Sequence, residues 1–335
     1  MFAVKKVLVL GATGAIGKYL IPKLLERNYQ VDAVALDEVD YQSPNLRSIK
    51  GNALQWDFLL PLLENNYDGI VDFMIYRTAD CYMFVPELLK HTAHYIYLSS
   101  YRIYDNRQIP VREDSPRLID SSEDMLLRNS DDYCIFKARG ENILTASGKK
   151  NWTIVRPAIT YSLMRYQLVT LEAYRTVGRA VQGKGVVLPA AAREVNATMS
   201  WAGDIAEMLA RLLFNPSALT EAFTLATAEH HTWGEIADYY HDICNLNAIW
   251  VDTEDYIKLL NFPPYLPNPR WQLIYDRFFD RIIDNSKVLE VCGMHQSSMR
   301  KLYDGLKYEV SRFKLPPEWQ NLNDPMDEYL AGLGK

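Results

Sequence analysis

The sequence predicts an α/β fold with a parallel sheet and a smaller, mostly helical carboxyl-terminal part. Three observations lead to this prediction. The chain begins with an apolar run that stops at three glycines spaced three apart, and a helical pattern follows at once. Strand and helix patterns then alternate up to about residue 157, as in chains built from β-α-β units. Beyond that point the alternation breaks down, and the last third is rich in Tyr, Trp and Pro.

The individual elements can be placed along the chain. We expect strands at residues 7–10, 30–37, 46–52, 69–75, 93–100, 151–157 and 221–227. Helical patterns cover residues 18–25, 57–65, 79–91, 131–147, 201–215, 232–243 and 286–292, and two more flank residues 183–185. Residues 104–130 contain prolines, serines and many charges, and we interpret them as a long surface loop. This order is typical of a Rossmann-type, doubly wound parallel sheet, whose ligands bind at the carboxyl ends of the strands.

Composition limits the class of protein. The chain has 335 residues, 48% of them hydrophobic, and a net charge of −6, which argues against a broad nucleic-acid surface. The first ten residues are a strand candidate too short for a signal peptide, and no apolar run reaches the ~18 residues of a membrane span. We therefore expect a cytoplasmic protein with no nucleic-acid or membrane partner. The four cysteines and six histidines show no metal-ligand or disulfide spacing, so no metal is expected (Cys81, Cys134, Cys244, Cys292, His91, His94, His230, His231, His241, His295).

The glycine-rich turn after the first strand predicts a dinucleotide site. Glycine permits backbone angles closed to other residues and lets a pyrophosphate approach the main chain. The helix that follows then presents its free N–H groups to the phosphates. The candidate cofactor-binding residues of this turn are Gly11, Thr13, Gly14, Ala15, Ile16 and Gly17. A merely structural glycine turn is the alternative.

Asp37 lies at the end of the second predicted strand, about 20 residues after Gly17, where such folds place an acid on the adenosine ribose. A carboxylate there would repel a 2′-phosphate, so the sequence favours NAD over NADP. An ordinary acidic turn is the alternative interpretation, because Glu38 and Asp40 are also acidic. We expect residues 1–157 with about 195–229 to form the NAD-binding domain, and about 158–194 with 230–335 to form a substrate-binding domain.

A second motif, Tyr133-x-x-x-Lys137, falls in the helix predicted over 131–147. Residues four apart lie on the same helix face, so the phenol and the ammonium point the same way. A neighbouring cation favours the phenolate, the form in which a tyrosine acts as a general base. Ser100 stands at the carboxyl end of the fifth strand, where ligands of this fold bind. Each feature alone is more often structural, and their order along the chain gives them weight.

Together these motifs resemble extended short-chain dehydrogenases/reductases, in the NAD-dependent epimerase/dehydratase group that acts on sugar nucleotides. The resemblance is carried by residues 11–17, the Ser-Ser-Tyr-Arg-Ile-Tyr stretch at 99–104, the Tyr-x-x-x-Lys at 133–137 and Val-Arg-Pro at 155–157, with looser echoes at 201–206 and 284–288. It implies that Ser100 binds the substrate oxygen, that Tyr133 takes the hydroxyl proton, and that Lys137 holds the nicotinamide ribose. It also implies a homodimer formed through the helix that carries Tyr133 and the helix after the fourth strand.

Several positions depart from the family pattern. Asn52 replaces the acid that the family places at the adenine, and asparagine can both donate and accept there. The bulky Phe73-Met74-Ile75-Tyr76 replaces a segment that is small in the family. The 4,6-dehydratases carry Asp-Glu after the catalytic hydroxyl residue, whereas this chain has Tyr101-Arg102, which argues against dehydration. Arginine binds phosphate through a planar fork of donors, so Arg193, Arg277 and Arg281 are candidates for a substrate diphosphate, with plain surface charges as the alternative.

The sequence thus favours an NAD-dependent epimerase of nucleotide sugars, or a closely related oxidoreductase. Two alternatives stay open. One is an NAD(P)-dependent reductase of a non-sugar carbonyl. The other is a non-catalytic nucleotide-binding relative, such as a cofactor sensor or an RNA-binding protein, which the bulky residues after the fourth strand keep open.

Overall fold

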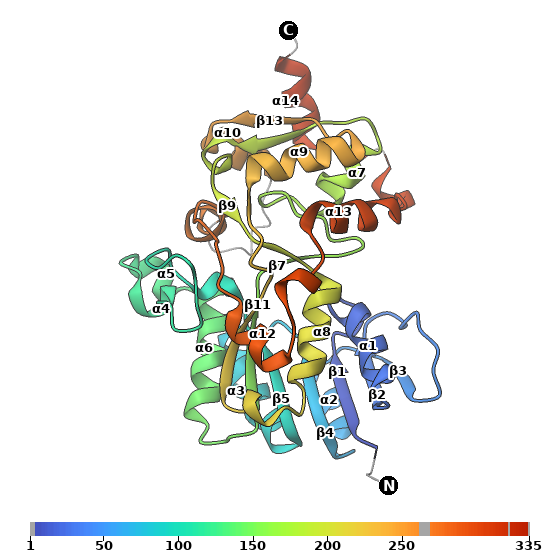
Figure 1. Ribbon diagram of the computed structural model, residues 1–335. Coiled ribbons are helices and arrows are strands. Elements are labelled where there is room, and N and C mark those ends of the chain that lie inside the picture. Colours follow the sequence, from blue (N-terminus) through green and yellow to red (C-terminus); the bar gives the residue numbers. More distant parts are fainter. Residues whose placement is uncertain (1–3, 261–268, 321, 334–335) are drawn as a thin grey trace.

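A computed structural model describes residues 4–260, 269–320 and 322–333 of the chain (Figure 1). Its centre is a seven-stranded sheet in which every pairing is parallel. From one edge to the other the strands are β11 (Glu221–Leu225), β6 (Trp152–Pro157), β5 (Thr92–Leu98), β4 (Tyr67–Asp72), β1 (Lys6–Leu10), β2 (Gln30–Ala35) and β3 (Leu46–Lys50). Each of the seven strands predicted from the sequence is present, and the doubly wound fold is confirmed.

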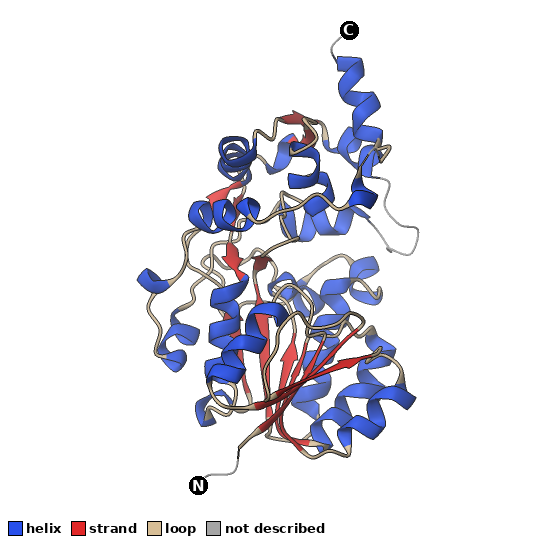
Figure 2. Ribbon diagram, turned by 90° about the vertical axis from the view of Figure 1, so that its right-hand side faces the viewer, coloured by secondary structure: helices blue, strands red, loops and turns tan. Residues whose placement is uncertain are grey.

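Helices cover both faces of this sheet, as Figure 2 shows. One face packs against α1 (Gly17–Glu26), α8 (Ala202–Leu212) and α12 (Ser286–Cys292). The other packs against α2 (Trp56–Leu63), α3 (Thr78–Lys90) and α6 (Tyr133–Ala146). The central strands are apolar on both faces for this reason: Val7, Leu8, Val9 and Leu10 are all fully buried.

The carboxyl-terminal part is mostly helical, and its apolar core around Tyr161, Tyr166, Trp233 and Tyr240 also includes Tyr104 from the segment after β5. Its helices are α7 (Val177–Ala180), α9 (Trp233–Cys244), α10 (Thr253–Leu260), α11 (Pro269–Gln272), α13 (Leu302–Ser311) and α14 (Pro325–Leu333). Three short strand pairs accompany them: β7 (Ile159–Tyr161) with β10 (Met199–Trp201), β9 (Asn196–Ala197) with β12 (His231–Thr232), and β8 (Val186–Pro189) with β13 (Ala248–Val251).

Two sequence predictions need correction. The stretch after Gly185 was predicted to be helical, but Val186–Pro189 forms strand β8 in parallel register with β13. Adjacent β-branched valines fit a pleated strand better than a helix, and the partner strand lies some sixty residues away, where local pattern cannot show it. The predicted loop 104–130 also contains two short helices, α4 (Leu118–Ser121) and α5 (Met125–Asn129).

The helix predicted at 286–292 is confirmed as α12. It packs against the sheet, whereas the segments before and after it along the chain belong to the carboxyl-terminal part. Val288 and Cys292 are buried in the apolar cluster between the sheet, α1 and α8. This segment therefore returns to the sheet from the carboxyl-terminal part of the chain. No helix within residues 4–260, 269–320 and 322–333 is long and apolar enough to cross a membrane.

Candidate active site

A cavity of about 630 Å³ opens at the carboxyl ends of the sheet strands, between the sheet and the carboxyl-terminal part of the chain. Its floor comes from the segments that follow β1 to β5, and its opposite wall from residues after β6 and from Arg165, Gln167, Glu172, Gln272 and Arg277. All eight cofactor-binding residues predicted from the turn and the next two strands line it: Gly11, Thr13, Gly14, Ala15, Ile16, Gly17, Asp37 and Asn52.

The glycine turn has the backbone that a dinucleotide needs. Gly11 has φ +78°, and a Cβ at this position would lie 3.2 Å from the Cβ of Phe73. A Cβ at Gly17 would collide with the main chain of Ala12. Helix α1 begins at Gly17 with no side-chain cap. Lys18 N and Tyr19 N donate to Gly14 O (3.3 Å) and Ile16 O (3.0 Å), so the N–H of Gly17 is the one left for an anion at the cavity among the described first-turn groups. The bulky Phe73 is accommodated because glycine stands opposite it.

The adenosine end of the cavity carries Asp37, which is exposed and forms no hydrogen bond with other described residues. Its carboxylate is therefore available to accept from ribose hydroxyls. Asn52 uses its side-chain oxygen to accept from the backbone N–H of Leu54 at 3.0 Å, which leaves its amide N–H groups for a ligand. The residues that are present thus fit a nicotinamide dinucleotide.

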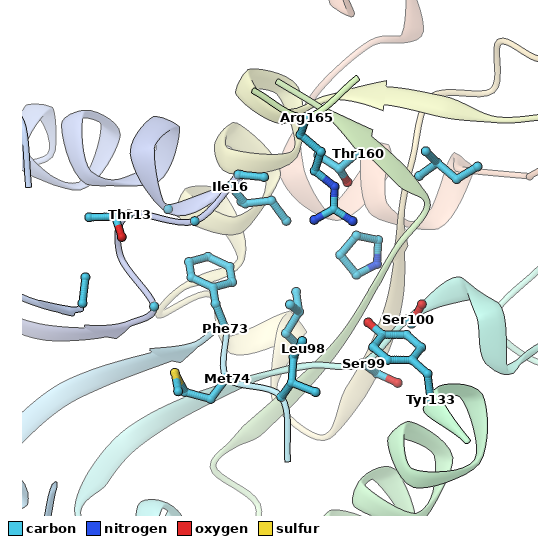
Figure 3. A pocket seen from close by; sticks show the side chains of 18 of the residues that line it. Thr13, Ile16, Phe73, Met74, Leu98, Ser99, Ser100, Tyr133, Thr160 and Arg165 are labelled. Carbon is cyan, nitrogen blue, oxygen red and sulfur yellow. The ribbon is translucent and has the colours of Figure 1, made fainter. Parts of the chain in front are cut away.

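Ser100 and Tyr133 come from different elements and face the same region of the cavity (Figure 3). Ser100 follows β5 and is 6% exposed; its Oγ accepts from the backbone N–H of Arg102 at 3.2 Å. Tyr133 is the first residue of α6, directly after Asp132, whose carboxylate caps the helix by accepting from Cys134 N at 3.1 Å. The cap fixes the start of the helix and hence the position of the phenol. The neighbouring Ser99 Oγ is buried and has no hydrogen-bond partner among the described residues.

Lys137 lies one helical turn beyond Tyr133, beneath the floor of the cavity. It is fully buried, and its Nζ donates to Leu98 O at 2.6 Å and to Met74 O at 3.3 Å. The same Nζ is 5.9 Å from the centroid of the Tyr133 ring. Its side chain does not line the cavity.

Asp72, at the end of β4, belongs to the same buried layer as Lys137. Burial raises the pKa of its carboxyl group, against the opposing effects of hydrogen bonds from Tyr95 Oη (2.7 Å) and Met74 N (2.9 Å) and of the Lys137 charge. Sequence reasoning did not select Asp72, because it is the last residue of a strand whose preceding residues are apolar (Ile70, Val71).

Arginines form the wall beside Tyr133. The Arg102 guanidinium lies 5.1 Å from the centroid of the Tyr133 ring and near two carboxylates, Asp132 (3.6 Å) and Asp276 (3.5 Å). Burial would raise the pKa of Asp276, but the charges of Arg277, Arg281 and Arg102 outweigh burial and hold that pKa below its usual value. Asp276 therefore carries a negative charge that holds these arginines together.

The structure separates the three arginines predicted to contact a diphosphate. Arg277 lines the cavity, held by Val169 O at 2.6 Å and Tyr101 Oη at 2.8 Å. Arg281 is buried behind it, donating to Tyr104 O at 3.0 Å, and Arg193 has a 59% exposed side chain stacked near Trp250. Neither lines the cavity. Sequence reasoning did not select Arg102 and Arg165, although Arg102 stands only two residues after Ser100.

Comparisons with known proteins agree with this geometry. A family model described as NAD(P)H-binding matches residues 11–216, so the chain belongs to this NAD(P)H-binding family. No curated protein matches the sequence.

Solved structures share the fold along almost the whole chain. An epimerase from Methanothermobacter thermautotrophicus superposes with a TM-score of 0.70 at 14% identity, over 92% of this chain and 91% of that one. UDP-glucuronic acid 4-epimerase from Bacillus cereus, in complex with UDP-glucuronic acid and NAD, gives 0.68 at 16% identity over 91% and 98%. The enzyme WbmH from Bordetella bronchiseptica, in complex with NAD⁺, gives 0.65 at 18% identity over 93% and 100%. The expected likeness to extended short-chain dehydrogenases/reductases is confirmed.

Proposed function

We propose that this protein is an NAD-dependent epimerase of nucleotide sugars, or a closely related oxidoreductase of the extended short-chain type. The observation that carries the proposal is the convergence of Ser100 and Tyr133 on the cavity that the glycine turn and Asp37 also line. Sugar epimerases with bound NAD among the structural neighbours support it. Hydride exchange with one general acid/base is sufficient for either reaction.

When bound at the glycine turn and Asp37, NAD would supply reversible hydride exchange with a substrate carbon. Ser100 Oγ donates a hydrogen bond to the oxygen on that carbon and orients it. Tyr133 Oη removes the hydroxyl proton as the carbon is oxidised and returns it upon reduction. The Lys137 ammonium lies 5.9 Å from the ring centroid and the Arg102 guanidinium 5.1 Å from it, so two positive charges adjoin the residue that we propose as the base. A role of Lys137 on the nicotinamide ribose stays a prediction.

Dehydration of the 4,6-dehydratase kind does not fit the residues beside Ser100. The two positions after it hold Tyr101 and Arg102, and the Tyr101 hydroxyl accepts from Arg277 at 2.8 Å. Among the described residues that line the cavity, only Asp37 and Glu172 carry a carboxylate, and Asp37 lies at the adenosine end. We therefore propose that the reaction consists of oxidation and reduction without an elimination step.

The proposal also covers the choice of cofactor. We propose NAD rather than NADP, because the exposed Asp37 carboxylate would repel a 2′-phosphate. Titration of the cofactor-free protein with NAD and with NADP measures this choice. Tighter binding of NADP would contradict the role given to Asp37.

We further propose that the protein is a homodimer that pairs through the outer faces of α3 and α6. Tyr82 and Met83 on α3 are 67% and 50% exposed, and a groove between the two helices is lined by Tyr82, Pro86, Leu89, Ile143 and Ala146. Large exposed apolar patches mark interaction surfaces. Light scattering on the wild type and on Tyr82→Glu tests this: a wild-type monomer would contradict the proposal.

The function itself is tested by identifying the nucleotide that copurifies with the protein and by screening UDP-, GDP- and dTDP-sugars for interconversion. Bound NAD with epimerisation of one of these sugars is the expected result. Reduction of a non-sugar carbonyl, with cofactor exchanged at each cycle, would replace the proposal by the reductase alternative. Bound cofactor without turnover of either kind would favour a cofactor sensor.

A further inference from the structure

Two guanidiniums at the substrate end of the cavity have donors that the protein does not use. Arg165 follows β7, and Figure 3 shows it pointing into the cavity from the wall opposite Ser100 and Tyr133. Within the described part of the chain, its guanidinium forms no hydrogen bond and no ion pair. The Arg102 guanidinium forms no hydrogen bond to another described residue: its buried Nε lies 3.5 Å from Asp276, its Nη2 lies 3.6 Å from Asp132, and the group stacks on Tyr133.

The neighbouring Arg277 and Arg281, in contrast, use their guanidinium donors in hydrogen bonds within the protein. Arg277 donates to a backbone carbonyl, to Tyr101 and to Asp276, and Arg281 donates to Asp276 and to three backbone carbonyls. These two have structural partners that account for their positions. Arg102 and Arg165 both line the cavity without a hydrogen bond to another described residue, and a guanidinium in that position points to a ligand that would complete it.

Arg165 is held in place although its side chain is exposed. A tight turn presents it: Ser162 N donates to Arg165 O at 3.2 Å, and Arg165 N donates to Ser162 O at 2.9 Å. Met164, within this turn, has φ +67°, the left-handed conformation. A turn fixed by reciprocal hydrogen bonds limits where the guanidinium can reach.

The charges at this end of the cavity do not balance. Four guanidiniums (Arg102, Arg165, Arg277, Arg281) lie with three carboxylates (Asp132, Glu172, Asp276), and the Lys137 ammonium lies 5.9 Å from the centroid of the Tyr133 ring. Positive charge is therefore in excess beside the proposed base. A carboxylate on the ligand would complement it and matches the planar guanidinium fork.

The location of Arg102 and Arg165 indicates which part of the substrate carries the negatively charged group. Arg102 lines the cavity, and its guanidinium stacks on the Tyr133 ring, so it adjoins the proposed base that handles the reacting hydroxyl. The complementary anion therefore belongs to the reacting sugar itself, not to a diphosphate farther along the substrate.

We propose that Arg102 and Arg165 make this protein specific for a nucleotide sugar whose reacting sugar bears a carboxylate, a uronic acid. The inference rests on the proposed function. Arg102 and Arg165 bind the carboxylate from two sides and so fix the ring with its hydroxyl against Ser100 and Tyr133. A neutral sugar would leave both guanidiniums unpaired.

The test compares binding of sugar pairs that differ only in the carboxylate: UDP-glucuronic acid with UDP-glucose, and GDP-mannuronic acid with GDP-mannose. Isothermal titration of the NAD-loaded protein should give roughly tenfold or greater tighter binding of the acidic member of one pair. In Arg165→Gln and in Arg102→Gln this preference should fall to about one. Arg193→Gln, at an exposed arginine outside the cavity, should keep it.

Equal or tighter binding of the neutral sugars by the wild type overturns the inference, as does binding of no member of either pair. A preference that survives in both Arg165→Gln and Arg102→Gln overturns the roles of these residues. Arg165 is exposed, so its variant tests the inference even if Arg102→Gln fails to fold. Turnover decides the proposed function separately: interconversion of neutral sugars alone keeps that function and refutes this specificity, whereas selective binding without interconversion does the reverse.

Discussion

Replacing Glu141 by Gln should destabilise the protein strongly, because Glu141 ties the helix of Tyr133 to the sheet. Glu141 on α6 is 1% exposed and accepts from Arg156 of β6 through Nε and Nη2, both at 2.8 Å. Arg156 is 6% exposed and also donates to Tyr104 Oη at 2.7 Å and to Glu113 O at 2.8 Å. Glutamine keeps the shape but leaves the buried guanidinium without its counter-charge.

Removing one partner of a buried ion pair costs about 3–5 kcal/mol, and we expect Glu141→Gln to fall in this range. Urea unfolding followed by circular dichroism measures the change. Asp120→Asn is the matched control: Asp120 pairs with Arg117 at 2.7 Å but its side chain is 57% exposed, so its loss should cost less than about 1 kcal/mol. A cost below about 1 kcal/mol for Glu141→Gln would refute the reasoning that this pair fastens α6.

The remaining predictions concern pH, the cofactor turn and its control. Burial, helped by the charge of Lys5, lowers the pKa of His94 from 6.5 to about 4. The unfolded chain binds the proton more readily between these values, so stability should be constant above pH 6.5 and fall towards pH 4, by up to ~3 kcal/mol from this group. His94→Gln can still hydrogen-bond but does not titrate; an unchanged pH profile of urea unfolding in this variant would exclude His94 as the source. Gly17→Ala should weaken cofactor binding roughly tenfold or more, because its Cβ would displace the Ala12 main chain. Gly332→Ala, where a Cβ meets open space, should bind as the wild type does, and equal affinity of the two variants would contradict the steric argument.

The sheet and its cofactor turn could be predicted from the sequence because both depend on residues that are close together in the chain. The apolar run before Gly11 is buried on both faces, and the glycine spacing reflects contacts within the turn itself. Asp37 and Asn52 follow neighbouring strands, so the known order of the fold brings them to the same edge. Ser100 and Tyr133 were predicted from motif order, and the structure places both at the cavity.

The substrate side could not be predicted in this way because its contacts join distant segments. Arg277 reaches the cavity through Tyr101 and Val169, each more than a hundred residues away, and no spacing rule separates it from Arg281, which is buried behind it. The position of the Arg165 side chain is set by a turn whose conformation could not be predicted from the sequence. Strand β8 was mistaken for helix since its partner β13 lies far along the chain.

Tyr133→Phe tests the central claim most directly, because it removes only the hydroxyl that exchanges the proton and keeps the ring on which Arg102 stacks. Wild type and variant, both loaded with NAD, are mixed with the nucleotide sugar that the screen identifies, and the absorbance of reduced nicotinamide is followed in a single turnover. The account predicts unchanged NAD affinity and hydride transfer slowed by about a hundredfold or more. Transfer at the wild-type rate would contradict it.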